Sequence, residues 1–231
     1  MFKYACSKIR DSIYALVASS PNAPGKYDEE NLISLGTAIM VAPGILLTAS
    51  HLIHIQSSRA NPIHQSFEVV RPDATRKVEN AVFLTEDSDR DMALLKIEEP
   101  SSKACVYLEP NQVPIGASCG LMGFPLPTED DGNLYFVKRF QSGHLSAYTP
   151  LTLPSGARHK FYELDFLAYI GFTGSPVFLT NGNVLGMYVR SAKSTGMITN
   201  ITNPVESRHT ISLCIPSMEI ISFLREKEII D

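Results

Sequence analysis

The chain has 231 residues, a length that one large all-β domain or two small domains can fill. Hydrophobic residues make up 44% of it and charged residues 19%, so it can bury a core and lacks the composition of a disordered chain. The formal net charge is −4, and the densest basic stretch, residues 71–77, has three positive residues around Asp73. This balance does not favour a nucleic-acid partner. No apolar run approaches the ~18 residues of a transmembrane helix, so we expect no membrane association.

The start of the chain places basic residues before the apolar stretch 13–18, an order that signal peptides share. The stretch is short and rich in β-forming residues, so a first strand is the favoured interpretation. The four cysteines lie far apart and form neither a C-x-x-C pair nor a cluster with histidine. We interpret them as reduced core thiols of a cytoplasmic protein, with a structural disulfide as the alternative. They are Cys6, Cys105, Cys119 and Cys214.

Short apolar runs, separated by Pro, Gly and Asn clusters, continue along most of the chain. They predict strands at 13–18, 35–41, 45–48, 67–71, 77–84, 92–97, 119–122, 134–140, 143–147, 161–164, 177–179, 184–189 and 210–215. Pro43-Gly44 and Asn181-Gly182-Asn183 predict hairpin turns, because glycine adopts positive φ without strain. So many short strands predict an all-β sandwich or barrel.

One helix is predicted after Pro216, where Ser217 can cap a segment with Ile220, Ile221 and Leu224 at helical spacing. The acid-rich stretch 98–103 is interpreted as a surface linker near the middle of the chain. The chain is therefore expected to divide into halves of about 1–105 and 106–215, followed by a helix at about 217–228.

Three segments contain residues of the types that nucleophilic catalysis uses. In the first, a hairpin of two apolar strands leads into Thr48-Ala49-Ser50-His51. A histidine at the end of a buried strand is held firmly enough to act as a general base, although a lone histidine is more often structural. In the second, strand 92–97 begins directly after Asp91. The Asp91 carboxylate can lie at the barrel edge and accept the histidine Nδ1–H. The alternative is a solvated acidic loop.

The third segment is the glycine-rich turn Gly171-Phe172-Thr173-Gly174-Ser175-Pro176-Val177-Phe178. A turn of this kind leaves backbone N–H groups unpaired and directed at one point, which suits an oxyanion hole. A tight hairpin turn with no catalytic role explains the segment equally well when it is taken alone.

In this order, the segments resemble those of the trypsin-like, chymotrypsin-fold serine proteases, closest to the bacterial glutamyl-endopeptidase-like and Htr-type branches. Thr48-Ala49-Ser50-His51 resembles the catalytic-histidine motif, residues 91–95 the D-[IM]-A-L-L strand, and residues 171–178 the nucleophile motif G-x-S-G-[GS]-P. The resemblance covers about residues 12–224. It implies a single peptidase domain over 1–231, built from two six-stranded antiparallel β-barrels and a C-terminal α-helix. It also implies an extended peptide or protein substrate and no cofactor.

The resemblance assigns a role to each matching residue. His51 would be the general base, Asp91 its orienting partner, and the backbone N–H groups of Gly171 and Thr173 the oxyanion hole. The pocket for the residue before the scissile bond would be lined by Leu167, Ala168, Tyr169, Met187, Tyr188 and Val189. The wall has no acidic residue and the strand has no histidine, so a small or apolar substrate side chain is expected.

The chain departs from the family at the nucleophile, because Thr173 stands where the family has serine. A threonine hydroxyl can be activated by a base, but its β-methyl restricts χ1, and a misplacement of about 1 Å costs on the order of 10²-fold in rate. Ser175 is expected to point away from His51, and Phe172 to add bulk beside the oxyanion hole. Three interpretations stay open: a slow threonine-dependent protease, an inactive module that binds peptides or a protein partner, and an active-site variant made for study.

A competing motif, Gly116-Ala117-Ser118-Cys119-Gly120, matches the G-x-S-x-G elbow of α/β-hydrolases. That elbow needs a following helix, which Pro125 and Pro127 prevent, and the chain has no βαβ alternation. A metal site is not favoured either, because His51 and His54 lack a suitably spaced carboxylate and no H-E-x-x-H occurs. The remaining histidines, His64, His144, His159 and His209, are interpreted as loop residues.

Overall fold

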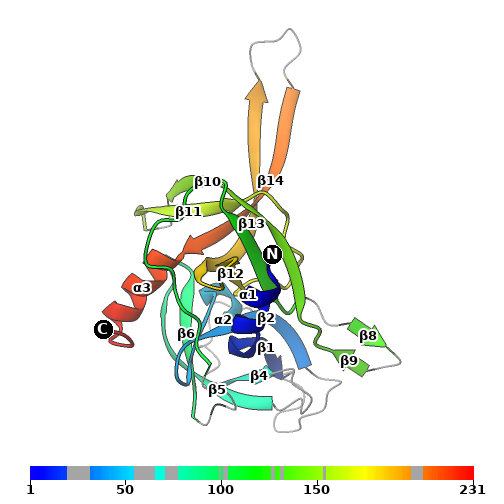
Figure 1. Ribbon diagram of the computed structural model, residues 1–231, viewed down its shortest axis with the longest axis vertical. Coiled ribbons are helices and arrows are strands. Elements are labelled where there is room, and N and C mark those ends of the chain that lie inside the picture. Colours follow the sequence, from blue (N-terminus) through cyan, green and yellow to red (C-terminus); the bar gives the residue numbers. More distant parts are fainter. Residues whose placement is uncertain are drawn as a thin grey trace.

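The computed structural model describes residues 1–19, 32–54, 66–70, 78–98, 100, 104–125, 128–130, 133–152, 155–198 and 205–231. Its strands form two closed barrels of six strands each, ordered β1-β2-β3-β6-β5-β4 and β10-β11-β14-β13-β12-β7 (Figure 1). Neighbouring strands in both barrels run antiparallel. The all-β, two-barrel prediction is therefore confirmed.

The N-terminal barrel is built from short apolar strands joined by tight connections. Its strands are β1 (Ile13–Ser19), β2 (Leu32–Ala42), β3 (Ile45–Thr48), β4 (Ser66–Val70), β5 (Val78–Asp87) and β6 (Met92–Ile97). The turn between β2 and β3 has Gly44 at φ 76°, as the Pro-Gly pair predicts. The four positions of β3 pair in register with β6, from Ile45 opposite Lys96 to Thr48 opposite Ala93. The candidate histidine lies on the short helix that follows β3, and the candidate aspartate directly precedes β6.

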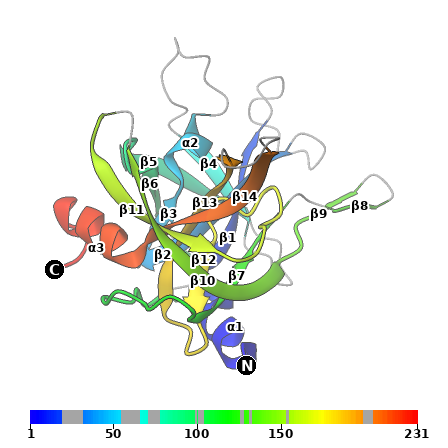
Figure 2. The ribbon, with the colours of Figure 1, turned by 90° about the horizontal axis from the view of Figure 1, so that it is seen from above.

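The C-terminal barrel has longer strands than the sequence predicts. They are β7 (Ser118–Gly123), β10 (Arg139–Thr152), β11 (Arg158–Leu164), β12 (Pro176–Leu179), β13 (Val184–Ile198) and β14 (Val205–Pro216). Residues 192–198 and 205–211 extend β13 and β14 beyond the barrel as a two-stranded arm (Figure 1). The strand predicted at 134–140 is wrong in part. Residues 136–138 are not in a strand and separate β10 from a small side sheet of β8 (Thr128–Asp130) and β9 (Asn133–Tyr135) (Figure 2).

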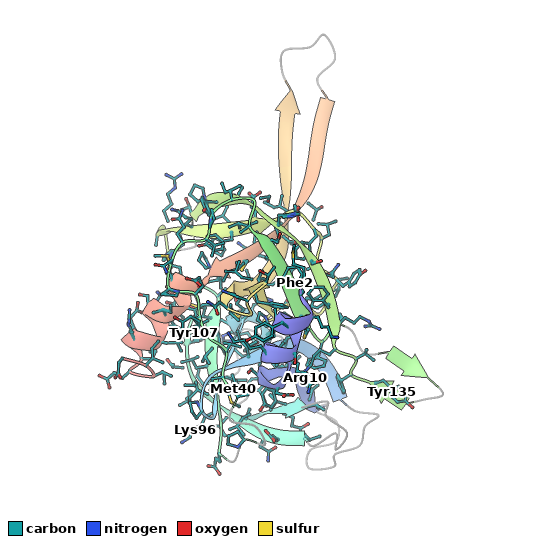
Figure 3. All side chains as sticks on the ribbon, viewed as in Figure 1. Phe2, Arg10, Met40, Lys96, Tyr107 and Tyr135 are labelled. Atoms are coloured by element: carbon teal, nitrogen blue, oxygen red, sulfur yellow. The ribbon has the colours of Figure 1, made fainter. Side chains whose placement is uncertain are left out.

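The helices lie at the ends of the chain and beside the candidate site: α1 (Lys3–Ile9), the 3-10 turn η1 (Arg10–Ser12), α2 (Ser50–Ile53) and α3 (Ser217–Glu226). The C-terminal helix is confirmed, but Ser217 does not cap it. Pro216 is the N-cap, and the Ser217 hydroxyl donates to the Glu109 carbonyl. Helix α1 is not predicted by the sequence. Phe2 lies directly before it (Figure 3). The Phe2 ring packs against two aromatic rings of the C-terminal barrel, those of Phe140 and Phe178.

One cluster of buried side chains is shared by the two barrels. It joins Ile39 and Leu47 of the first barrel to Phe178 and Leu213 of the second. A second cluster lies within the C-terminal barrel and includes Leu121, Leu145, Phe172, Val177 and Tyr188. Each barrel is thus completed by side chains of the other, which fixes the seam on which the candidate site lies.

The four cysteines are free thiols. Cys119 and Cys214 are buried as predicted, but Cys105 is exposed because it lies in the irregular segment between the barrels, and Cys6 is half-buried on α1. The basic stretch 71–77, His64 and most of the predicted linker 98–103 fall outside the described residues. Among the helices that are described, none is both long and apolar enough to span a bilayer.

Candidate active site

His51 and Asp91 meet at the end of the N-terminal barrel, His51 on the one-turn helix α2 after β3 and Asp91 directly before β6. His51 Nδ1 lies 2.8 Å from Asp91 Oδ2 and 3.0 Å from Oδ1. The backbone N–H of His51 also donates to Asp91 Oδ1, at 2.9 Å. The carboxylate therefore fixes both the ring and the backbone of the histidine. A neutral imidazole held in this way carries its proton on Nδ1 and leaves Nε2 free to accept one.

A second carboxylate, that of Glu86, steadies α2 from the other side. Its Oε2 accepts hydrogen bonds from Ser50 Oγ at 2.7 Å and from His54 Nε2 at 2.8 Å. Ser50 also donates its backbone N–H to the Asp91 carbonyl at 3.2 Å. Residues on both sides of His51 are thus bonded to the end of β5, and Ser50 also to the connection that follows it. These bonds limit the movement of a short helix that could not hold its shape alone.

Asp91 adopts a left-handed backbone conformation, with φ of 59°. Its neighbour Arg90 is nearly buried and donates to Asp87 Oδ2 at 2.6 Å and to Glu226 Oε2 of α3 at 2.5 Å. Burial by itself would lower the pKa of Arg90, but these two hydrogen bonds outweigh it and raise the pKa. The charged guanidinium therefore joins the turn that carries Asp91 to the C-terminal helix.

The glycine-rich turn brings Thr173 to the seam between the barrels. Three backbone hydrogen bonds hold it: Phe172 N–H to the Tyr169 carbonyl, Ser175 N–H to the Phe172 carbonyl and Gly174 N–H to the Tyr188 carbonyl. Gly171 and Gly174 have φ of 95° and 85°, a region that other residues enter only with strain. By contrast, the N–H groups of Gly171 and Thr173 donate to none of the described residues.

The turn is docked on β2 of the other barrel. The Thr173 carbonyl accepts the N–H of Thr37 at 2.8 Å. A Cβ on Gly174 would lie 1.9 Å from the Thr37 carbonyl oxygen, so only glycine fits this approach. A Cβ on Gly36 would lie 2.7 Å from the Thr173 carbonyl oxygen and 2.8 Å from Leu52 Cδ1. The turn and the helix that carries His51 therefore meet over the same glycine of β2.

The Thr173 hydroxyl donates to the Val189 carbonyl at 3.3 Å. Among the described residues, no hydrogen bond joins this hydroxyl to His51. Val189 occupies a bulge, where the register between β13 and β14 shifts between Tyr188 and Arg190. A bulge of this kind releases a carbonyl from the ladder, which leaves the Val189 oxygen free to receive the hydroxyl.

Two residues of the turn point inward. Phe172 is fully buried in the core of the C-terminal barrel and stacks on Tyr169, so it does not add bulk beside the unpaired N–H groups as the sequence suggested. Ser175 is also fully buried. Its Oγ packs so closely on Gly123 that a Cβ added to that glycine would lie 1.9 Å from it. It is thereby withdrawn from solvent, in keeping with the expectation that it does not face His51.

The predicted pocket wall runs along the surface beside this turn. Leu167 and Tyr169 are more than half exposed, and Ala168 between them donates its N–H to Ser212 Oγ at 3.2 Å. Gln141 braces the wall, since its Nε2 donates to the Leu167 carbonyl at 3.1 Å and its Oε1 accepts the Tyr169 N–H at 3.4 Å. Gln141 and Ser212 come from β10 and β14, so no local motif identifies them.

The predicted pocket strand divides between two sides of the sheet. Met187 and Val189 pack in the core that the barrels share, whereas Tyr188 packs inside the C-terminal barrel, behind the wall. The Tyr188 hydroxyl lies 3.0 Å from Ser191 Oγ. Burial raises the pKa of Tyr188, although hydrogen bonds to Ser191 and Ser212 act against the rise. Tyr188 and Ala168 thus share Ser212 as a partner.

The histidines interpreted as loop residues lie on strands instead: His144 on β10, His159 on β11 and His209 on β14. Polar residues on the outward face of a strand resemble a loop when sequence alone is considered. His144 repeats the arrangement of His51, with its Nδ1 3.0 Å from Asp165 Oδ2 and its N–H bonded to Oδ1 at 2.7 Å. In the pairing of β10 with β7, Ser118 lies opposite His144.

The family model of the trypsin-like peptidase domain matches residues 36–187, a span that contains His51, Asp91 and Thr173. The chain belongs to the trypsin-like peptidase family. The resemblance inferred from the sequence is thereby confirmed. A comparison of this peptidase with curated protein sequences gives no match.

Solved structures agree with the fold of this trypsin-like peptidase. The protease Rv3671c from M. tuberculosis, in its active form, is 15% identical with a TM-score of 0.66, over 96% of this chain and 82% of that one. An inactive mutant of the same protein from M. tuberculosis H37Rv is 16% identical with a TM-score of 0.66, over 97% and 91%. The HtrA-type protease AlgW, solved with a tripeptide, is 18% identical with a TM-score of 0.67, over 97% and 62%. At such identities the likeness concerns the fold.

Proposed function

We propose that this peptidase cleaves peptide bonds in extended peptides or protein segments, with His51 as general base, Asp91 as its orienting partner and Thr173 as nucleophile. One observation carries the proposal. The turn with two unpaired N–H groups, at Gly171 and Thr173, docks on the same stretch of β2 as the helix of the His51–Asp91 pair. Serine-type hydrolysis needs a hydroxyl, a base and oxyanion donors in such an arrangement.

The chemistry follows from this arrangement. The Thr173 hydroxyl passes its proton to His51 Nε2 while Oγ1 attacks the substrate carbonyl carbon. The oxygen of that carbonyl becomes negative and is stabilised by the N–H groups of Gly171 and Thr173. Asp91 stabilises the imidazolium, which then protonates the leaving amine as the peptide C–N bond breaks. Water, activated by His51 in the same way, hydrolyses the resulting ester and regenerates Thr173.

The Thr173 side chain slows this reaction. Its hydroxyl is bonded to the Val189 carbonyl and must turn away before His51 can take its proton. The turn about χ1 moves the β-methyl towards the place of the incoming carbonyl, which a serine would leave open. We therefore expect a rate on the order of 10²-fold below that of a serine at the same position.

The wall supports a small or apolar substrate side chain next to the scissile bond. Tyr188 fills the space behind Ala168, and its hydroxyl is held by Ser191. The exposed wall residues on either side of Ala168 are apolar or aromatic, namely Leu167 and Tyr169. A long or charged side chain would meet the Tyr188 ring without a charged partner.

A peptide-binding module without hydrolysis is the second candidate. It is favoured by the Thr173 hydroxyl, whose hydrogen bond goes to Val189 rather than to His51. The unpaired N–H groups and the edge of β13 would still bind an extended peptide.

The free thiols of all four cysteines agree with a reducing compartment, so we keep a cytoplasmic location as part of the proposal.

A fluorophosphonate probe with intact-protein mass spectrometry distinguishes the two candidates. We expect Thr173→Ser to form the adduct about 10²-fold faster than the natural chain, which itself labels slowly. Adding His51→Ala to Thr173→Ser should abolish labelling, because the base is lost. Ser175→Ala, the matched control, should label like its parent because Ser175 is buried. If Thr173→Ser forms the adduct and the natural chain does not, the natural chain is assigned to the binding module. If neither protein forms the adduct, the catalytic site is refuted.

A further inference from the structure

Strand β13 is far longer than its contact with the barrel requires. It spans Val184–Ile198, but it pairs with β12 only as far as Met187. Its pairing with β14 continues to Ile198 opposite Val205. From Val189 onward, the edge of β13 away from β14 is not paired with any described strand, and Figure 1 shows the arm standing clear of both barrels.

The register shows which backbone groups this edge presents. Tyr188 directs its N–H and carbonyl to the nucleophile turn, where they bond to Ser175 and Gly174 at 2.9 and 2.8 Å. The bulge then adds Val189, whose carbonyl faces the same edge and receives the Thr173 hydroxyl. Because backbone groups alternate along an antiparallel strand, every second residue after Val189 faces this edge. These residues are Ser191, Lys193, Thr195 and Met197.

An open row of N–H and carbonyl groups binds an extended chain as an added strand. Here the row begins beside Thr173 and runs outward along the arm, so continuity with the nucleophile favours a substrate as the occupant. A peptide whose scissile bond lies at Thr173 would run antiparallel to β13. Its first, third, fifth and seventh residues before the scissile bond would then lie opposite Val189, Ser191, Lys193 and Thr195 in turn.

We propose that the arm is an extended substrate-binding edge, which pairs with the backbone of the fifth and seventh residues before the scissile bond. The proposal rests on the peptidase function proposed above. It makes long, extended and unfolded segments the preferred substrate class, because a folded protein cannot present seven unpaired residues in a row. Recognition along the arm is through backbone groups and is therefore tolerant of sequence.

The test anchors peptides at the nucleophile, so that their register is known. Peptidyl diphenyl phosphonates of three, five and seven residues, ending in alanine phosphonate, react with Thr173→Ser, where an Oγ–P bond forms and phenol leaves. We expect the second-order rate to rise roughly fivefold with each two-residue extension, in line with the net strength of one or two added backbone hydrogen bonds. Residues are counted back from the phosphonate. N-methylation of the fifth residue should remove the gain in rate from three to five residues, whereas N-methylation of the fourth should leave that gain unchanged.

A protein-side variant tests the same edge. Lys193→Pro removes an N–H from the open edge but none from the pairing with β14, and Lys193→Ala is its matched control. We expect the proline variant alone to react with the five-residue inhibitor no faster than with the three-residue one. Both variants should keep the parent rate with the three-residue inhibitor, which shows that the site itself is intact.

The outcomes separate the two proposals. If all lengths react at one rate, or if N-methylation of the fourth and fifth residues has equal effects, the arm proposal is overturned while the peptidase function stands. A single rate together with a dimer in analytical ultracentrifugation that Lys193→Pro disrupts would assign the edge to a second copy of the chain, which also overturns it. If no inhibitor reacts with Thr173→Ser, the proposed function itself is refuted.

Discussion

Gly174 is the residue on which the contact between the glycine-rich turn and β2 depends. Its φ of 85° excludes most side chains, and the 1.9 Å that would separate an added Cβ from the Thr37 carbonyl oxygen excludes the rest. Gly156 has the same φ of 85° but nothing within 4 Å of its Cβ position. The two glycines therefore separate the effect of backbone conformation from that of close approach.

We predict that Gly156→Ala lowers the free energy of unfolding by about 1–2 kcal/mol, the effect of positive φ alone. Gly174→Ala should cost about 1–3 kcal/mol more, because the turn must also move away from β2. Urea unfolding of both variants measures the difference. Equal losses would mean that the turn does not press on Thr37.

The sequence predicts at this scale only what local motifs encode. It points to His51, Asp91 and the glycine turn as candidates because each adjoins a strand end or a run of glycines. The sequence does not predict that the Phe172 side chain points inward, because its burial depends on the barrel that surrounds it. Gln141, which braces the wall from a strand distant in sequence, leaves no local signal at all.

The connection between β5 and β6 is an element whose shape depends on a distant helix. Arg90 binds Asp87 at the end of β5 and Glu226 on α3, and it lies 5.7 Å from the centre of the Phe223 ring. The pKa of Asp87 is lowered, because the hydrogen bonds from Arg90 outweigh the effect of burial, which would raise it. The hydrogen bond from Arg90 is also the main cause of the lowered pKa of Glu226.

We predict that Arg90→Met destabilises the protein at pH 7, because Asp87 and Glu226 lose their partner. A lowered carboxylate pKa stabilises the fold above the unfolded value of about 4 and ceases to do so as the pH falls below the folded value. The loss caused by Arg90→Met should therefore shrink between pH 5 and about pH 3. Urea unfolding at both pH values measures this. Arg225→Met, which removes an arginine from α3 beside Glu226, is the control. A loss independent of pH would show that packing, not charge, is what Arg90 contributes.

Element boundaries are predicted best where burial sets the pattern. The sequence predicts β3 and β6 with their observed ends because both are short, apolar and paired along their whole length. It misses the end of β10, at 148–152, and most of the arm, whose residues are held by pairing with a neighbouring strand rather than by a core. It also misses α1, a seven-residue helix that contacts a distant loop, where Lys8 donates to the Asn181 carbonyl.

The whole molecule is held together by the core cluster that the two barrels share. Two barrels with separate cores would unfold separately, whereas a shared core couples them. Leu47 of β3 is fully buried in the shared cluster, and Leu121 of β7 is fully buried in the cluster within the C-terminal barrel.

We predict a single calorimetric transition, whose midpoint falls by a comparable amount in Leu47→Ala and in Leu121→Ala. Each substitution should cost about 2–5 kcal/mol. Differential scanning calorimetry records the midpoint, and the ratio of calorimetric to van't Hoff enthalpy should be close to one. Two transitions, each moved by only one of the variants, would contradict the coupling.

The hydrogen bond between Thr37 and Thr173 has a consequence for a chain still being made. Under the proposed function, the base and its aspartate leave the ribosome early, while the hydroxyl and its N–H partners follow about eighty residues later. Until that second half folds onto β2, the emerging chain carries no working centre. A newly made protease is in this way unable to digest its own unfolded neighbours, and any break between the halves that separates the barrels would silence it again.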